Sequence, residues 1–532
     1  MEKRIASYDT TLRDGCQARG ISLSAEDKWR ISQRLDEMGI DYIEGGWPNP
    51  TNPRDLEFFE RARRGVLKHS KLTAFGSTRR ADNPPEKDPV LETLLRAEAP
   101  VVAIFGKSWD LHVQKVLKVS PAENLAMIES SVRHLKEAGR EVVFDAEHYF
   151  DGYRGNPKYA LETLRAAQEG GADWVVLCDT NGGSLLNQVE EGVKAAKEVL
   201  SVPFGMHMHN DSGLAVAGTL AGVMAGATQV QGTINGYGER CGNANLCTVI
   251  PILELKMGYR CIGEGKLRQI AELSRYVAEL ANVAHEERQP FVGAAAFSHK
   301  AGMHIDGIVK ERRSFEHVPP ESVGNHRELL VSDQAGTRAV VEMLKDEFPE
   351  LEKGDPGVRK VLEALKKLEH QGWQFEAADA SFKLLARKIL KSYNPIIELE
   401  RFRVLVEKRA DGETDCEAVL KVRVNGRPQY TAATGDGPVN ALDNALRKAL
   451  GEFGEELGRI ALTDYKVRVL DEKSATAARV RVLIDTKDEE DRWGTVGASE
   501  NIIEASWQAL VDSIEYGLQK AMAKGKRLEE RP

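Results

Sequence analysis

The chain repeats one pattern eight times between residue 4 and about residue 260: a short apolar run ends in glycine or polar residues, and a stretch with helical periodicity follows. Buried strands read as continuous apolar runs, and strands that alternate with amphipathic helices pair in parallel through right-handed crossovers. Eight such units predict an α/β fold, a closed (β/α)8 TIM barrel. The apolar runs are IASYDT (5–10), IDYIEGG (40–46), KLTAFGS (71–77), VVAIFGK (101–107), EVVFDAE (141–147), WVVLCDT (174–180), FGMHMHN (204–210) and QVQGTING (229–236).

A doubly wound open sheet is the structural alternative, but no Gly-x-Gly-x-x-Gly follows any of these runs. The chain of 532 residues is too long for one core, and the pattern of its apolar residues changes twice along the sequence. We expect a catalytic barrel over 1–280, a linker region of helical subdomains over 281–395, and an α+β domain over 396–532. The last domain is a weak internal duplication, because each half offers strands, a glycine turn and an amphipathic helix, at 439–450 and at 502–518.

The composition excludes several classes of protein. The formal net charge of -9 argues against a nucleic-acid partner and an anionic membrane surface, because the field of the whole molecule would repel both. No run approaches the ~18 apolar residues of a membrane span, and the start lacks the apolar stretch of a signal peptide. The six cysteines show no Cys-x-x-Cys spacing, so we expect reduced thiols and a cytoplasmic protein.

His207 and His209 lie two residues apart at the end of the seventh apolar run, which places both imidazoles on one side of a strand. Reactive groups of a barrel gather at the carboxyl ends of its strands, where Asp14 and Asn243 supply oxygen ligands. Mixed nitrogen and oxygen donors suit Mn²⁺, Mg²⁺, Zn²⁺ or Fe²⁺ with positions open for substrate. Without Asp14 nearby, the histidines would be only polar residues at a strand end.

Other polar side chains follow further apolar runs. Arg13 adjoins Asp14 and is placed to direct its guanidinium at the oxygen that a metal polarises, which would stabilise a developing alkoxide. Glu147 and Asp145 share a face of the fifth run, and spacing does not decide which of them is the acid or base. Thr180 offers a hydroxyl to a substrate carboxylate. His304 becomes a site residue only if the linker region folds over the barrel mouth.

Three segments, DTTLRDGCQ (9–17), HMHND (207–211) and GYGERCGN (236–243), resemble the DRE-TIM metallolyase superfamily. The duplicated domain resembles the regulatory domain of 2-isopropylmalate and citramalate synthases. The segments EGGWPNPTNPRD, FDAEHYFDGY and FSHKAGMH look most like those of citramalate synthases. The resemblance implies a divalent metal ion (Mn²⁺, Mg²⁺ or Zn²⁺) on Asp14, His207, His209 and Asn243, carbonyl polarisation by Arg13, substrate contacts from Gln17 and Thr180, and acid–base roles for Glu147 and His304.

The reaction implied by the resemblance is a Claisen condensation of acetyl-CoA with pyruvate, followed by thioester hydrolysis to citramalate and CoA on the route to isoleucine. A homodimer with isoleucine as a feedback effector is also implied. An enzyme that takes 2-oxoisovalerate, a 2-isopropylmalate synthase, is the first alternative, and homocitrate synthase is a second. A non-catalytic amino-acid sensor would have lost Arg13, a metal ligand or Glu147, and all of them are present. Whether Glu147 or His304 removes the proton stays open.

Overall fold

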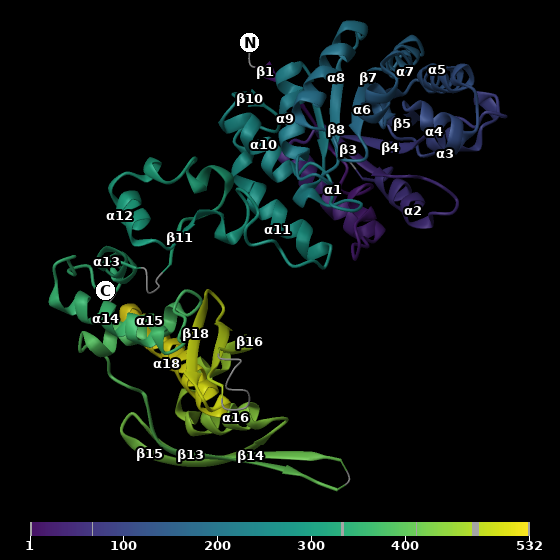
Figure 1. The fold of residues 1–532 in the computed structure, drawn as a ribbon. Coiled ribbons are helices and arrows are strands. Elements are labelled where there is room, and N and C mark those ends of the chain that lie inside the picture. Colours follow the sequence, from purple (N-terminus) through teal and green to yellow (C-terminus); the bar gives the residue numbers. More distant parts are fainter. Residues whose placement is uncertain (1–2, 66, 331–334, 411, 471–477, 530–532) are drawn as a thin grey trace. The chain divides into compact units, whose positions relative to one another are not determined.

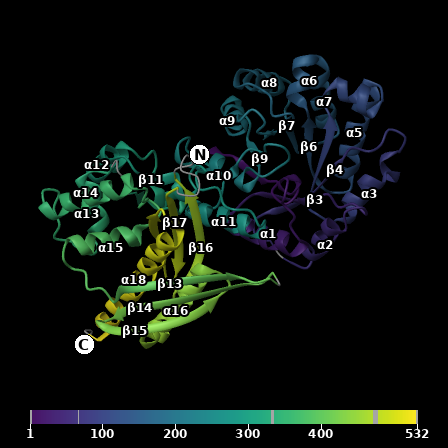
Figure 2. The same ribbon diagram turned by 60° about the horizontal axis from the view of Figure 1, so that its bottom comes forward.

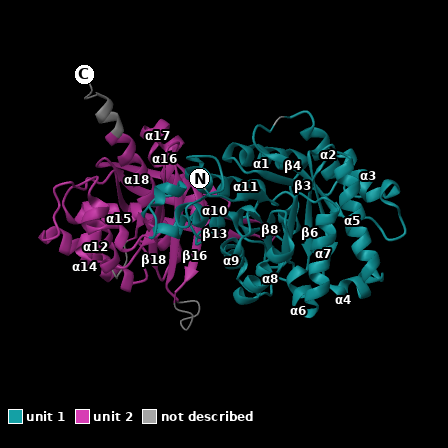
Figure 3. Ribbon diagram, turned by 90° about the horizontal axis from the view of Figure 1, so that it is seen from above, with its two compact units in different colours: residues 1–297, 317–327 teal, residues 298–316, 328–532 magenta. Residues whose placement is uncertain are grey.

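The computed structural model describes residues 3–529, except 66, 331–334, 411 and 471–477 (Figure 1). The chain forms two compact units, which Figure 3 colours separately. The first consists of Met1–Phe297 and His317–Arg327, and the second of Ser298–Glu316 and Glu328–Pro532. The units are coarser than the three domains predicted over 1–280, 281–395 and 396–532, whose boundaries stay predictions.

The first unit contains a closed barrel of eight parallel strands, which confirms the predicted fold. Each strand pairs with the next along the chain, and the first pairs with the last, with Ala6 opposite Gln229. Every strand falls within one of the predicted apolar runs. The strands are β2 (Ala6–Asp9), β3 (Tyr42–Gly46), β4 (Lys71–Ser77), β5 (Val101–Lys107), β6 (Glu141–Glu147), β7 (Trp174–Asp179), β8 (Phe204–Met208) and β9 (Gln229–Gly232).

Helices between the strands cover the outside of the barrel (Figure 1). Local sequence sets where they begin and end: Ser24 and Asp27 form a capping box at the start of the first helix, and Gly39 ends it at φ 80°. One core fills the space between strands and helices, and a smaller one fills the inside of the barrel. The main helices are α1 (Ala25–Met38), α2 (Pro53–Ala62), α3 (Pro89–Arg96), α5 (Pro121–Glu137), α7 (Pro157–Glu169), α8 (Leu186–Val199), α9 (Ala215–Ala225), α10 (Leu246–Leu255) and α11 (Ile270–Leu280).

The second unit begins with helices and continues with two similar strand–helix halves, as the predicted duplication requires. Its first helices are α12 (Gly302–Lys310), α13 (Thr337–Leu344), α14 (Pro356–His370) and α15 (Asp379–Ile389). One half is an antiparallel sheet of β13 (Ile397–Lys408), β14 (Thr414–Val424) and β15 (Arg427–Gly435) with α16 (Pro438–Ala449) packed on it (Figure 2). The other half consists of β16 (Ala461–Val469), β17 (Val480–Lys487), β18 (Arg492–Ser499) and α18 (Ile502–Glu529).

The linker helix α15 shares a core with the second of these halves. Phe375 and Phe382 are buried in the same cluster as Val496 of β18. The Ser381 hydroxyl donates to Asp512 of α18 at 2.7 Å and accepts the N–H of Val496 at 3.1 Å. Removing the C-terminal domain at residue 396 would therefore expose the apolar face of α15. None of the helices in the described part of the chain has both the length and the hydropathy needed to cross a membrane.

Candidate active site

A cavity of about 230 Å³ lies at the carboxyl ends of the barrel strands. Seven of the nine predicted site residues line it, and they come from the ends of four different strands, because parallel pairing brings all carboxyl ends to one face. The seven are Arg13, Asp14, Gln17, Glu147, Thr180, His207 and His209. The other two, Asn243 and His304, are described below.

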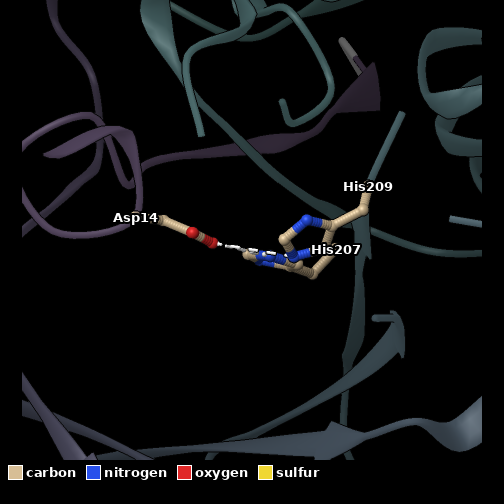
Figure 4. Close-up of side chains that lie close together, drawn as sticks. All are labelled: Asp14, His207 and His209. Carbon is tan, nitrogen blue, oxygen red and sulfur yellow. Dashed lines mark ion pairs between the residues drawn. The ribbon is translucent and has the colours of Figure 1, made fainter. Parts of the chain in front are cut away.

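Asp14, His207 and His209 converge in this cavity, as Figure 4 shows. Asp14 follows β2, His207 lies in β8, and His209 comes directly after that strand. The Asp14 Oδ2 atom lies 3.2 Å from His207 Nε2 and 3.8 Å from His209 Nε2. All three side chains are buried, and one potential ligand atom from each lies within 4.8 Å of the others. This spacing is that of donors around a single ion.

Orphaned buried oxygens show that the donor set fits a divalent cation. Asp14 Oδ1 and Asn243 Oδ1 are buried and have no hydrogen-bond partner among the described residues. Such oxygens cost free energy unless a donor or a cation satisfies them. Asn243 pairs through its backbone with His209, and its amide nitrogen donates to the carbonyl of Tyr237 at 3.2 Å, which leaves the amide oxygen for a ligand. Two histidines and a carboxylate suit Mn²⁺, Mg²⁺ or Zn²⁺, and the Asn243 oxygen stays a predicted further ligand.

Metal binding needs ionised carboxylates and neutral imidazoles, and the surroundings of Asp14 and His209 favour these forms, whereas those of His207 do not. Burial works to raise the pKa of Asp14, but Arg13 and His207 outweigh it and hold this pKa well below its usual range. Burial and the neighbouring His207 lower the pKa of His209 to about 3, so this ring is neutral. Burial works to lower the pKa of His207, yet the hydrogen bond and charge of Asp14 raise it.

Gln231, which the sequence did not single out, orients His207. Its side-chain oxygen lies 2.8 Å from His207 Nδ1 and accepts the ring proton there, so Nε2 is presented to Asp14. The Gln231 amide nitrogen in turn donates to Asp145 Oδ1 at 3.4 Å and to Gln229 Oε1 at 3.3 Å. Both glutamines lie on β9 and are fully buried. Only a weak indication of these two glutamines is present in the sequence, namely that the run which forms β9 is unusually polar for a barrel strand.

Arg13 is held by Glu44, a second residue to which the sequence assigned no role. The guanidinium Nε donates to Glu44 Oε1 at 2.6 Å, and Nη1 lies 3.4 Å from Asp14 Oδ2. Glu44 is fully buried in the middle of β3 and also accepts the hydroxyl of Tyr8 at 2.7 Å. The guanidinium lies over the ring of Phe75, 3.8 Å from its centroid. These contacts fix Arg13 in one orientation at the cavity.

Asp145 and Glu147, which spacing could not distinguish, have different surroundings. Asp145 is buried beside Gln231, and burial together with the charge of Glu44 raises its pKa to about 7. Glu147 is more exposed and forms an ion pair with Lys107 at the end of β5. Both carboxylates line the cavity; Glu147 is the more exposed of the two, and Asp145 is hydrogen-bonded to the buried Gln231.

The remaining predicted residues lie at the rim or in the second unit. The Thr180 hydroxyl accepts the backbone N–H of His148 at 2.9 Å, and Gln17 is exposed in the short 3₁₀ turn Gly15–Gln17. His304 lies on α12 in the second compact unit, where its ring stacks on Phe315 at 4.4 Å between centroids. Its participation at the barrel mouth stays a prediction.

The raised pKa of Asp145 yields a stability prediction for the metal-free protein. Folded Asp145 keeps its proton up to about pH 7, whereas the unfolded chain loses it near 3.8. Raising the pH through this window favours the unfolded state, because burial opposes the charged form. Asp145→Asn removes this penalty. We expect the variant to gain stability relative to the wild type, on the order of 1 kcal/mol or more, between about pH 4 and about pH 8 in EDTA, measured by urea unfolding. A difference independent of pH would contradict the buried carboxyl.

Three family models match consecutive parts of the chain. The model described as HMGL-like matches residues 4–277, which is just over half of the chain and contains the whole barrel. The model described as homocitrate synthase post-HMGL domain-like matches residues 291–372. The model described as LeuA allosteric (dimerisation) domain matches residues 376–518, which contain α15 and both strand–helix halves up to Leu518.

Curated relatives match nearly the whole chain. An (R)-citramalate synthase from Aquifex aeolicus is 50% identical over 99% of this chain and 100% of the relative. Another from Geobacter sulfurreducens is 50% identical over 97% of each chain. A probable 2-isopropylmalate synthase from Methanopyrus kandleri is 31% identical over 97% of this chain and 98% of the relative.

Proposed function

The chain belongs to the HMGL-like family and, within it, to the (R)-citramalate synthases, and on this premise we propose that it condenses acetyl-CoA with pyruvate to citramalate and CoA. One observation carries the choice of pyruvate. Relatives named (R)-citramalate synthase reach 45–50% identity over 96–99% of this chain, whereas a probable 2-isopropylmalate synthase reaches 31%. The enzyme is thus an acyltransferase that extends a 2-oxo acid by two carbons.

The predicted site residues have distinct parts in this reaction. Asp14, His207, His209 and Asn243 would hold a divalent ion, Mn²⁺, Mg²⁺ or Zn²⁺, which when bound supplies Lewis-acid polarisation of the 2-oxo acid. Arg13 donates to the carbonyl oxygen and stabilises the negative charge that develops there. Thr180 and Gln17 hold the carboxylate end of pyruvate. These contacts place the carbonyl carbon for attack.

A base, Glu147 or His304, takes a methyl proton from acetyl-CoA, and the resulting carbanion carbon forms a bond with the carbonyl carbon of pyruvate. The carbonyl oxygen becomes a hydroxyl by accepting a proton from the acid of this pair. Water then cleaves the thioester, so that the free acid and the CoA thiol leave. Glu147 is placed for the first step, because its carboxylate lines the cavity beside Lys107.

Three aromatic side chains at the cavity, the aromatic wall, favour a 2-oxo acid acceptor with a small side chain. Trp47, Phe75 and Phe105 contact one another with ring centroids 5.6–5.9 Å apart, and all three line the cavity beside Arg13. Asp55 fixes the Trp47 loop, because its carboxylate accepts the N–H of Trp47 at 2.8 Å and pairs with the buried Lys28. Rigid rings next to the reacting carbonyl leave room for a methyl group and oppose the branched side chain of 2-oxoisovalerate.

A second cavity, of about 280 Å³, supports acetyl-CoA as the other substrate. It lies over the ends of β4 and β5, shares Phe105 with the first cavity, and includes Lys107, which pairs with Glu147. Arg79 shapes its rim by donating to the carbonyls of Arg80, Ala81 and Asn83 at 3.0–3.2 Å. The guanidinium of Arg80 forms no ion pair within the described residues. Cationic groups next to the reaction cavity suit the phosphates of CoA.

Regulation and assembly belong to the same proposal. The match of residues 376–518 to a LeuA allosteric (dimerisation) domain supports a homodimer with an allosteric effector, and we propose isoleucine as that effector. Apolar side chains on the first sheet of this region, Leu405, Val406 and Tyr430, are more than half exposed, which fits a surface that a second copy covers. All six cysteines are free thiols, in keeping with the proposed cytoplasmic location.

Release of CoA from acetyl-CoA, measured separately with pyruvate, 2-oxoisovalerate and 2-oxoglutarate, tests the function directly. We expect pyruvate to give the highest kcat/KM, by about tenfold or more, because the isopropyl group of 2-oxoisovalerate and the carboxyethyl group of 2-oxoglutarate are larger than a methyl group and would have to fit against a rigid aromatic wall. EDTA should abolish turnover and Mn²⁺ restore it. Isoleucine, with leucine as the control amino acid, should inhibit the full chain. Faster turnover with 2-oxoisovalerate would assign a 2-isopropylmalate synthase instead.

The aromatic wall itself is tested by shortening Trp47. In Trp47→Ala the preference for pyruvate over 2-oxoisovalerate should fall by about tenfold or more, since the removed ring opens space for the branched chain. Trp47→Phe is the matched control and should keep most of the preference, because a ring remains against Phe75 and Phe105. An unchanged ratio of the two kcat/KM values in Trp47→Ala would show that the acceptor side chain lies elsewhere.

The second cavity is tested at Arg80. Arg80→Ala should raise the KM for acetyl-CoA by roughly tenfold, the effect of one lost charge-assisted hydrogen bond, and leave the KM for pyruvate unchanged. Arg133→Ala is the control, because Arg133 is an exposed arginine of α5 whose ion pair, among the described residues, is with Glu129 on the same helix. Equal KM values for acetyl-CoA in the two variants would place CoA outside this cavity.

A further inference from the structure

The turn that follows Glu147 contains an unusual backbone conformation. His148 has φ 59° and ψ 30°, the left-handed region, between the end of β6 and the helix α6 (Tyr149–Gly155). A residue with a Cβ is uncommon there, and such positions persist only where the surroundings hold them. The segment is part of FDAEHYFDGY, a motif to which the proposed reaction so far assigns only Glu147.

Side chains contact the His148 ring on several sides. The ring is buried, with the ring centroids of His112 at 4.3 Å and of Trp109 at 5.6 Å. Its Nδ1 atom lies 3.1 Å from Asp151 Oδ2, within hydrogen-bond distance. These contacts come from the loop after β5 and from α6, so they lock the ring between two strand exits.

The hydrogen bonds of Asp151 connect the end of β6 to the end of β7. Its Oδ2 atom also accepts from the side-chain amide of Asn181 at 2.9 Å, and its Oδ1 atom accepts from Arg154 at 2.5 Å. Asn181 directly follows Thr180 in the chain. One buried carboxylate therefore ties the residue after Glu147 to the residue after Thr180.

The left-handed turn has a direct consequence for Thr180. It directs the His148 N–H at the Thr180 hydroxyl oxygen, 2.9 Å away. A hydroxyl that accepts this bond keeps its own proton for another acceptor. Because Thr180 and Glu147 both line the reaction cavity, the turn sets the direction of a hydroxyl donor and of a carboxylate at once.

We propose that His148 is a positioning residue for the 2-oxo acid: held by Asp151, its ring maintains the left-handed turn that directs the Thr180 hydroxyl and the Glu147 carboxylate into the cavity. The inference rests on the proposed function in so far as a 2-oxo acid occupies this cavity. His148 acts through Thr180 and Glu147 and does not itself touch the substrate.

Three substitutions at His148 separate the backbone conformation from the ring. His148→Asn keeps a side chain that tolerates the left-handed region. His148→Gly permits the left-handed turn but removes the ring and its contacts, and His148→Ala disfavours the turn. We expect the KM for pyruvate to rise in the order Asn, Gly, Ala, by about tenfold or more in His148→Ala, while the KM for acetyl-CoA changes less than about threefold. Asp151→Asn weakens the hydrogen bond to the His148 ring but leaves His148 itself unchanged, and it should also raise the KM for pyruvate.

The control is Glu98→Ala. Glu98 is exposed, has φ 57°, and lies in the connection between α3 and β5, at the amino end of the strand. It carries the same backbone change away from the cavity, so both KM values should stay at the wild-type level. Melting temperatures of all variants are measured alongside. If His148→Ala does not fold, His148→Gly and Asp151→Asn carry the comparison.

A double-mutant cycle with Thr180→Val distinguishes positioning from general stability. If His148 acts through the Thr180 hydroxyl, His148→Gly should raise the KM for pyruvate much less in the Thr180→Val background than in the wild type. Fully additive effects, or equal changes in both KM values, would overturn the proposal. The proposed function fails separately: if the wild type bound pyruvate with Mn²⁺ but released no CoA, the stabilisation of each variant by pyruvate and Mn²⁺ would still decide the role of His148.

Discussion

Closure of the barrel, through pairing of β2 with β9, is the constraint on which the site depends. Asp14 follows the first strand of the barrel and His207 lies on the seventh, so these residues are far apart in the chain. Only a closed parallel sheet brings both strand ends to the same mouth. The distance of 3.2 Å between Asp14 Oδ2 and His207 Nε2 is a consequence of this closure, and in an open sheet the two edges would not meet.

Once the strand ends meet, buried charge has to be balanced. Arg13 lies between the carboxylates of Glu44 and Asp14 and over the ring of Phe75, so that its guanidinium is paired and stacked. A buried ion without such partners would be strongly unfavourable. The same balance leaves Asp14 ionised while one of its oxygens stays unsatisfied. The barrel thereby keeps an anionic ligand available for a cation. The stability of the folded barrel in turn depends on the charges of the groups around Asp14.

The second unit shows why predicted domains and compact units differ. Composition separates a helical region from the duplicated halves, but the apolar face of α15 is buried against β18 and α18. The buried Glu515 of α18 accepts the N–H groups of Ile396 and Ile397, where the chain passes from the helices into β13. Helices and regulatory halves thus share hydrogen bonds and core. Ile305 of α12, the helix that carries His304, lies in the same buried cluster as Val496 of β18, so a change of packing in this half would also alter the surroundings of α12.

The sequence alone determined the eight strands, the duplication and the three residues Asp14, His207 and His209 that converge as a candidate metal group, because hydrophobic periodicity and the order of polar residues at strand ends are local properties. It did not choose between Asp145 and Glu147, and it assigned no role to Glu44, Gln231 or His148. Those roles depend on contacts between distant residues: Glu44 with Arg13, Gln231 with His207, and His148 with Thr180. Only the tertiary structure decided them, since burial, pairwise distance and the direction of a hydrogen bond are fixed when the barrel closes and its side chains pack.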